Sequence, residues 1–175
     1  MAELNSRDRL QPSLLDRLID NNPQSRSEGL DARVLTRQQL RAAVLRDLSW
    51  LFNDTRQEPE ANSNRQDEVA LWRSHDLARR SVLNYGMPSF SGITLSSMDT
   101  ATIERETAQA IRNFEPRIDP DSLSVEVNID YASHHNSLQL VIRGKMWSQP
   151  VPLELLLSAD VDIETGNTSV RDLRG

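Results

Sequence analysis

The residues best suited to chemistry or to partner binding lie in Phe114-Glu115-Pro116-Arg117-Ile118. Proline ends a helix because it lacks an N–H and its ring clashes with the preceding turn. It also drives the residue before it toward an extended conformation. Glu115 and Arg117 therefore flank a rigid corner, one as an acceptor and the other as a five-donor fork. Such a corner could dock a partner, or it could form an internal salt bridge where a helix meets a strand.

Acidic residues are the other candidates for chemistry, because the chain contains 26 Asp and Glu. Glycoside hydrolysis needs two carboxylates facing each other across a cleft, one of them with a raised pKa. Glu126 and Asp130 fall at alternating positions that we expect to face water. The sequence has no Gly-x-Ser-x-Gly motif, and its six glycines form no phosphate-binding loop. A serine–histidine–aspartate triad is recognised by geometry and not by counting residues, so the sequence alone does not exclude one. No sequence motif here predicts an enzyme.

The sequence contains few possible metal ligands. It has no cysteine, which excludes disulfides and thiolate metal sites. His134 and His135 are neighbours, but a zinc site needs three or four ligands and no others are suggested nearby. His75 is interpreted as a surface or half-buried residue of a helix. We therefore expect no metal and no cofactor.

The composition is that of a small acidic protein. Its 175 residues suffice for one domain, and 37% apolar with 5% aromatic residues indicates solvated segments beside a small core. A net charge of −6 disfavours nucleic acid as a partner, because phosphate binding needs a basic surface. We find no signal-peptide pattern and no apolar run of roughly 18 residues that could span a membrane. We expect a cytoplasmic protein that is not inserted in a membrane.

The N-terminal residues 1–34 are mostly polar but contain one predicted short docking helix. Ser13 is placed to cap it, and Asp16 lies in its first turn. Its apolar residues, which recur at helical spacing, are Leu14, Leu15, Leu18 and Ile19. A helix this short is marginal alone, so it must dock on its own domain or on a partner. Residues 35–175 are predicted to form a single α+β domain, in which the polar segment 54–67 is a flexible linker.

About three longer helices are predicted from 3.6-residue periodicity. The first covers 36–53, where Thr36 and Gln39 match a capping box. The second covers roughly 71–84 and ends at Gly86, which suits the left-handed position after a helix. The third covers 99–114 and runs into the corner. The apolar stripe of the first helix is Leu40, Val44, Leu48, Leu51 and Phe52, and the buried stripe of the third is Ile103, Thr107, Ala110, Ile111 and Phe114. In the second helix, Leu71, His75, Ala78, Val82 and Leu83 lie near one face.

After the corner the apolar period changes from 3.6 to 2, which predicts half-buried strands. They cover about 123–131, 138–147, 153–163 and 168–173. Turns are expected at His134-His135-Asn136 and at Thr165-Gly166-Asn167. The fold class is therefore α+β, with the helices packed on a small antiparallel meander in the C-terminal half.

Five segments of the chain together resemble a known family. They are Ser13-Leu14-Leu15-Asp16-Arg17-Leu18, Leu45-Arg46-Asp47-Leu48-Ser49-Trp50-Leu51, Ser81-Val82-Leu83-Asn84-Tyr85-Gly86-Met87-Pro88, Phe114-Glu115-Pro116-Arg117-Ile118 and Asp162-Ile163-Glu164-Thr165-Gly166. The sequence resembles the TssE family of type VI secretion baseplate subunits, which is related to the wedge proteins of contractile phage tails. The resemblance covers nearly the whole chain, and the motifs follow the family's order.

The resemblance implies a structural role without catalysis. Glu115, Pro116 and Arg117 would contact the core bundle of the baseplate subunits TssF and TssG, with TssK in the same assembly. Leu14, Leu15 and Leu18 are further partner-binding candidates, because the short apolar helix needs a surface to cover it. An edge of the sheet would accept strands from the sheath proteins TssB and TssC, as exposed edges can.

Two other functions stay open at this point. The family has carried a lysozyme-like label, and a peptidoglycan-cleaving enzyme would need two acids lining a cleft. A small acidic inhibitor or chaperone-like binder would leave baseplate association unaffected by changes at Glu115 and Arg117.

Overall fold

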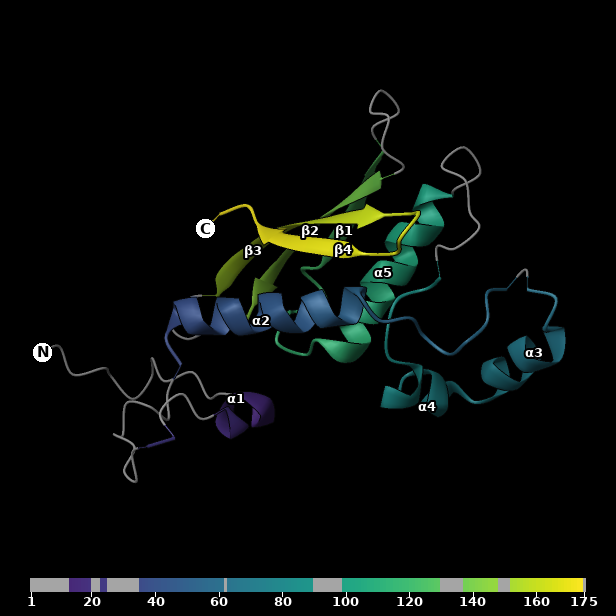
Figure 1. Ribbon diagram of the computed structural model, residues 1–175, viewed down its shortest axis with the longest axis horizontal. Coiled ribbons are helices and arrows are strands. Elements are labelled where there is room, and N and C mark those ends of the chain that lie inside the picture. The colour runs from purple at the N-terminus through teal and green to yellow at the C-terminus, as the bar shows by residue number, and fades with distance from the viewer. Residues whose placement is uncertain are drawn as a thin grey trace, which may run out of the picture.

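The computed structural model describes residues 13–19, 23–24, 35–61, 63–89, 99–129, 137–147 and 152–174. The predicted α+β architecture is confirmed: helices pack on one face of a four-stranded antiparallel sheet (Figure 1). The helices are α1 (Leu14–Leu18), α2 (Arg37–Phe52), α3 (Gln66–Ser74), α4 (Asp76–Arg79), the 3-10 helix η3 (Val82–Asn84) and α5 (Thr100–Phe114). The strands are β1 (Ser124–Ile129), β2 (Ser137–Met146), β3 (Leu153–Asp162) and β4 (Thr168–Asp172).

The sheet is the predicted meander, with strand order β1-β2-β3-β4. The long central pair runs from Ser137 opposite Asp162 to Met146 opposite Leu153. Between β3 and β4 the chain turns at Gly166, whose φ of +74° lies in the left-handed region that glycine adopts without strain. The sheet therefore has two outer strands, β1 and β4.

The core lies between the inner face of the sheet and helices α2 and α5. Alternate strand residues point into it, as the period of two predicts. The apolar strand residues of this core are Val125, Leu138, Leu140, Ile142, Met146, Leu155, Leu157, Ala159 and Val161. The predicted apolar stripe of α2 is buried in full, and the predicted buried stripe of α5 is confirmed at Ile103, Thr107, Ala110 and Ile111, with Phe114 partly buried. The capping box predicted at Thr36 and the cap predicted at Ser13 are both present, and the Asp16 side chain completes a capping box at Ser13 as well.

The prediction of one helix over 71–84 is wrong. The segment contains the end of α3, a break at His75, the four-residue α4 and the 3-10 helix η3. His75 has φ −122° and ψ 68°, which is not helical. Apolar spacing suggested a buried face, but Leu71, Val82 and Leu83 are exposed, and Val69 is the buried residue of α3. Periodicity describes which residues share a face, but it does not say that anything covers that face.

Part of the predicted linker 54–67 is tied to the domain. The Met87 N–H donates to the Asp54 carbonyl at 2.8 Å, and the Arg56 N–H donates to the Met87 carbonyl at 3.0 Å. Gly86 has φ +117°, and a Cβ there would lie 2.7 Å from backbone atoms of residues 54–56. Glycine is needed here by this close approach as well as by its backbone conformation. The linker's flexibility and the domain boundaries stay predictions.

Several predicted features lie outside the described residues. They are Asp130, Tyr131 and the turn His134-His135-Asn136. Among the residues that the structure does describe, no helix is both long and apolar enough to cross a membrane.

Candidate functional site

The corner after α5 is pinned at both ends by backbone hydrogen bonds. Glu115 caps the helix with φ −123° and ψ 77°, and its N–H donates to the Ile111 carbonyl at 2.8 Å. Beyond Pro116, the Arg117 carbonyl accepts from the Trp147 N–H at 3.0 Å. Ile118 forms an isolated antiparallel bridge with Met146 at the end of β2. The chain between helix and sheet is therefore fixed on both sides of the proline.

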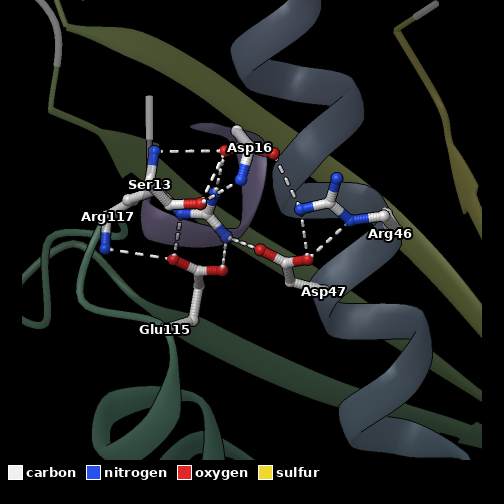
Figure 2. A network of polar contacts seen from close by, with 6 residues as sticks. All are labelled: Ser13, Asp16, Arg46, Asp47, Glu115 and Arg117. Atoms are coloured by element: carbon white, nitrogen blue, oxygen red, sulfur yellow. Dashed lines mark hydrogen bonds and ion pairs between the residues drawn. The ribbon is translucent and has the colours of Figure 1, made fainter. Parts of the chain in front are cut away.

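Glu115 and Arg117 pair with each other within this corner (Figure 2). Glu115 is only 2% exposed. Its Oε1 accepts from the Arg117 Nε at 2.6 Å and from the Arg117 backbone N–H at 3.1 Å, while Oε2 accepts from Nη2. The guanidinium thus binds the carboxylate through two parallel contacts, the arrangement that gives arginine–carboxylate pairs their strength and their directionality.

Helix α2 adds a second acid and a second arginine to the pair. Asp47 accepts from Arg117 Nη2 through Oδ2 and from Arg46 Nε through Oδ1, the latter at 2.8 Å. Arg46 Nη2 then donates to Asp16 of α1 at 2.9 Å. The result is a connected network in which three carboxylates, from α1, α2 and the corner, hold two arginines (Figure 2).

Helix α1 joins the network through its polar side. Asp16 belongs to the capping box of this helix, accepting from the Ser13 hydroxyl at 2.6 Å, and it also binds Arg46. Leu14 and Leu18 are 74% and 72% exposed, and Leu15 is exposed as well. A short helix that docks through one carboxylate and turns its leucines to solvent leaves its apolar face available to another protein.

The electrostatics of the network follow from burial and charge pairing. Burial alone would lower the pKa of Arg117, but hydrogen bonds and charges from Glu115 and Asp47 outweigh it and raise that pKa. Burial alone would raise the pKa of Asp16, but hydrogen bonds from Ser13 and Arg46 hold it below its ordinary value. Both groups therefore stay charged near neutral pH.

The corner and the neighbouring part of α2 contain one buried nitrogen without a hydrogen bond and several exposed side chains. The Arg117 Nη1 is buried without a hydrogen-bond partner, 3.9 Å from Oδ2 of Asp16. Pro116 is exposed, and beside it Trp147 is 69% exposed although its N–H is bonded to Arg117. On α2, Trp50 lies 5.2 Å from the Arg46 guanidinium and is exposed too. Exposed tryptophans beside a fixed arginine are typical of binding surfaces.

Sequence reasoning found Glu115, Pro116, Arg117 and the leucines of α1, but it missed Asp47, Arg46 and Trp147 as members of the site. The structure joins Glu115 and Arg117 directly, and Asp16 links α1 to them. Trp50 gave a usable signal, because it falls off the apolar stripe of α2. No local signal marked Asp47 as the partner of a residue 70 positions away.

The arrangement binds charge and offers no reactive group. Both oxygens of Glu115 and of Asp47 are held by arginines. Glu126, once a carboxylate candidate, is exposed and paired with Arg143. Within the described part of the chain, no group of three or more His, Cys, Asp or Glu side chains is arranged so that it could hold a metal ion. These contacts give no support to the lysozyme-like alternative.

Comparison with family models identifies the protein family of this chain. Residues 38–151 match the family of the baseplate wedge protein gp25. The chain belongs to this baseplate wedge family. The matched range includes Asp47, Glu115 and Arg117. A comparison with curated proteins gave no match.

Membership of the wedge family confirms the resemblance drawn from the sequence. It gives the protein a structural role in the baseplate of a contractile tail, in contact with other baseplate subunits. Four residues of the corner network, Arg46, Asp47, Glu115 and Arg117, lie within the matched range, so the network is the first place to look for such a contact.

Proposed function

We propose that this wedge protein is a TssE-type subunit of a cytoplasmic type VI secretion baseplate. In this role it joins the core bundle of TssF and TssG, beside TssK, and starts assembly of the TssB–TssC sheath. The observation that carries the proposal is the corner network, a fixed set of ion pairs. Its residues Arg46, Asp47, Glu115 and Arg117 lie in the family-matched part of the chain, and exposed aromatic and apolar side chains surround it.

Each residue of the corner has a distinct part in docking. Glu115 is too buried to touch another protein, so it acts by fixing Arg117. The contact surface is the exposed part of the Arg117 side chain, which is 21% exposed, together with Pro116 and Trp147. A fixed guanidinium loses little freedom on binding, and tryptophan and arginine dominate the energies of many interfaces.

Helix α1 supplies a second contact in this proposal. Its leucines, Leu14, Leu15 and Leu18, would enter an apolar groove of a baseplate subunit, as amphipathic helices commonly do. The support is the orientation of the helix: Asp16 is turned toward Arg46, and the leucines are turned to solvent.

For the sheath contact, the two outer strands differ in which of their outward backbone groups are already bonded to a side chain of the same protein. In the middle of β1, the Val127 N–H donates to the Glu104 side chain of α5 at 2.9 Å. On β4, the blocked residue is the first one: the Asn53 side chain accepts from the Thr168 N–H at 2.9 Å and donates to the Thr168 carbonyl at 2.8 Å. A side chain bonded to the middle of an outer strand interrupts pairing with an added strand, whereas a side chain bonded at the end of the strand does not.

The free part of β4 follows from the antiparallel pattern. Residues of an antiparallel strand alternate between those bonded to the neighbouring strand and those whose backbone groups face away. Since Thr168 faces away from β3, Val170 and Asp172 face away as well, and their backbone groups are available to an added strand. We therefore propose β4 as the edge that accepts a sheath strand from TssB or TssC.

Reconstitution with purified subunits tests the proposal surface by surface. Trp147→Ala should weaken binding to a TssF–TssG–TssK assembly, and Leu14→Ser/Leu18→Ser should weaken it separately. Neither change touches the core, so circular dichroism and thermal midpoints should match the wild type. Retention of full affinity by both variants would contradict the proposed docking surfaces.

The sheath contact has its own matched pair of variants. Val170→Pro removes an outward N–H from β4, a place where proline is tolerated in an edge strand. Ile129→Pro removes an equivalent outward N–H from β1, at a residue that is partly buried as Val170 is. If β4 is the accepting edge, only Val170→Pro abolishes TssB–TssC assembly on the baseplate. The reverse result would move the contact to β1.

A further inference from the structure

The segment formed by α3, α4 and η3, called the arm below, has a surface that takes no part in the contacts proposed for the corner and for the sheet. The arm lies apart from the sheet, beyond α5 (Figure 1). Between the arm, residues 56–61 and α5 lies a pocket of about 430 Å³. Its walls come from three separate segments of the chain, so a ligand in it would touch all three.

The charged side chains of the pocket wall are mostly arginines. They are Arg56, Arg73, Arg79, Arg80 and Arg105, against the acids Glu58, Asp76 and Glu106. Each of the three acids already has an arginine: Arg79 with Glu58 at 3.0 Å, Arg80 with Asp76 at 2.9 Å, and Arg56 with Glu106 at 2.8 Å. Arg56 also binds Glu60 at 3.3 Å. The acids of the wall are thus neutralised, and positive charge remains.

The remaining positive charge is at Arg73 and Arg105. Among the residues that the structure describes, neither makes an ion pair. Arg105 donates to the Thr102 hydroxyl at 3.1 Å, and after the hydrogen bond from Thr102 its charge also helps to lower the pKa of Asp99 at the start of α5. The Nε of Arg56 is buried without a hydrogen-bond partner. Guanidinium donors without acceptors, in a protein of net charge −6, make this pocket suited to carboxylates.

Large apolar side chains accompany the arginines along the arm. Leu77, Val82 and Leu83 are 87%, 81% and 66% exposed. Arg79 and Arg80 of the pocket wall lie between them in the sequence. Several exposed apolar residues within one short segment are typical of an interaction surface.

We propose that the pocket, together with Leu77, Val82 and Leu83, is a docking site for an acidic amphipathic segment of a partner protein. Carboxylates of that segment enter the pocket and pair with Arg73 and Arg105, and its apolar side chains cover the exposed residues of α4 and η3. The hollow form of the site favours a peptide over a membrane, because projecting side chains can reach arginines inside a pocket and a flat lipid surface cannot. The site does not depend on the corner or on β4.

Fluorescence anisotropy with two peptides tests this site. The probe is a fluorescein-labelled helical peptide with leucine on one face and glutamate on the other, and its counterpart carries glutamine in place of glutamate. We expect saturable binding of the glutamate peptide, weakened at least about tenfold in the glutamine peptide and in Arg73→Glu/Arg105→Glu, as for the loss of a close charge pair. Arg37→Glu/Arg112→Glu is the matched control, since it makes the same change in net charge and both arginines are exposed and lie outside the pocket wall.

Each other outcome counts against the proposal. Equal binding of the glutamine peptide, or unchanged binding by Arg73→Glu/Arg105→Glu, would overturn the role of the pocket. If the glutamate peptide shows no saturable binding while the protein binds phosphatidylserine vesicles, the surface is a membrane contact and the proposal is wrong. Because both arginines lie outside the corner, this test stands or fails separately from the baseplate experiments.

Discussion

The corner network and the outer face of the sheet contain the same kinds of charges in different surroundings. On the outer face, Arg143 pairs with Glu126, Arg171 with Asp160 and Arg174 with Glu154. These pairs are largely in water, where an ion pair contributes little because screening and side-chain entropy offset it. In the corner, Glu115 is buried, and breaking its pair would leave Arg117 and Asp47 with an incomplete network. Ion pairs therefore have to be ranked by burial before they are counted.

Removing the buried carboxylate should have the largest effect. Glu115→Ala is expected to lower the free energy of unfolding by about 3 kcal/mol, because the half-buried Arg117 loses its main partner. Glu126→Ala should leave the urea midpoint unchanged. Urea denaturation followed by circular dichroism measures both. Similar midpoints for the two variants would show that the corner pair is no different from a surface pair.

Replacing the guanidinium by an ammonium tests the two-contact geometry. Lysine keeps the charge but cannot bind Glu115 and Asp47 at the same time through a planar fork, so Arg117→Lys should cost about 1–2 kcal/mol. Arg143→Lys on the outer face should be silent in the same thermal and urea experiments. If Arg117→Lys left the free energy of unfolding unchanged, positive charge alone would be sufficient to stabilise the corner.

Asp16→Asn should act locally, since Asp16 is the residue that ties α1 to the network. The expected cost is about 1 kcal/mol, that of a hydrogen bond to a charged group in a partly exposed place. Hydrogen exchange should quicken at residues 14–19 and remain unchanged in α2 and the sheet. Loss of protection throughout the domain would show instead that α1 belongs to the cooperative core.

The docking of α1 should also depend on pH. Because the folded pKa of Asp16 lies below its ordinary value of 3.8, its contribution is present above that value and is lost as the pH falls through the lowered pKa. Fluorescence of a variant keeping Trp50 as its single tryptophan should change in this window, since Arg46 contacts both Asp16 and the Trp50 ring. Asp16→Asn should abolish the change, and a transition that survives this substitution would have another origin.

The smallest effect is expected for a double-mutant cycle between Glu126 and Arg143. Both side chains are about half exposed, so the coupling between Glu126→Gln and Arg143→Gln should be too small to measure in urea unfolding at moderate ionic strength. A clear coupling there would remove the contrast between the two surfaces.

The features predicted correctly from the sequence are those set by neighbouring residues. The N-terminal caps at Ser13 and Thr36, the turn at Gly166 and the alternation along β2 and β3 each depend on a few adjacent positions. Pro116 marked the corner for the same reason. Glu115 pairs there with Arg117, only two positions away.

The features that the sequence did not reveal depend on contacts between distant segments. Asp47 meets Arg117 across 70 residues, and Asp16 meets Arg46 across 30. Nothing local distinguishes these acids from the others in the chain. The helix predicted over 71–84 failed for a related reason, since its apolar residues have the right spacing but remain exposed, and His75 breaks the segment.

The most direct test of the account is the binding of Arg117→Lys and Arg143→Lys to a purified TssF–TssG–TssK assembly, measured beside the wild type. Both variants make the same chemical change, one in the corner and one on the outer face of the sheet. The account predicts that Arg143→Lys binds as the wild type does, and that Arg117→Lys, still folded, binds at least about tenfold more weakly. Equal binding by Arg117→Lys would show that the corner braces the fold and that the baseplate contact lies elsewhere.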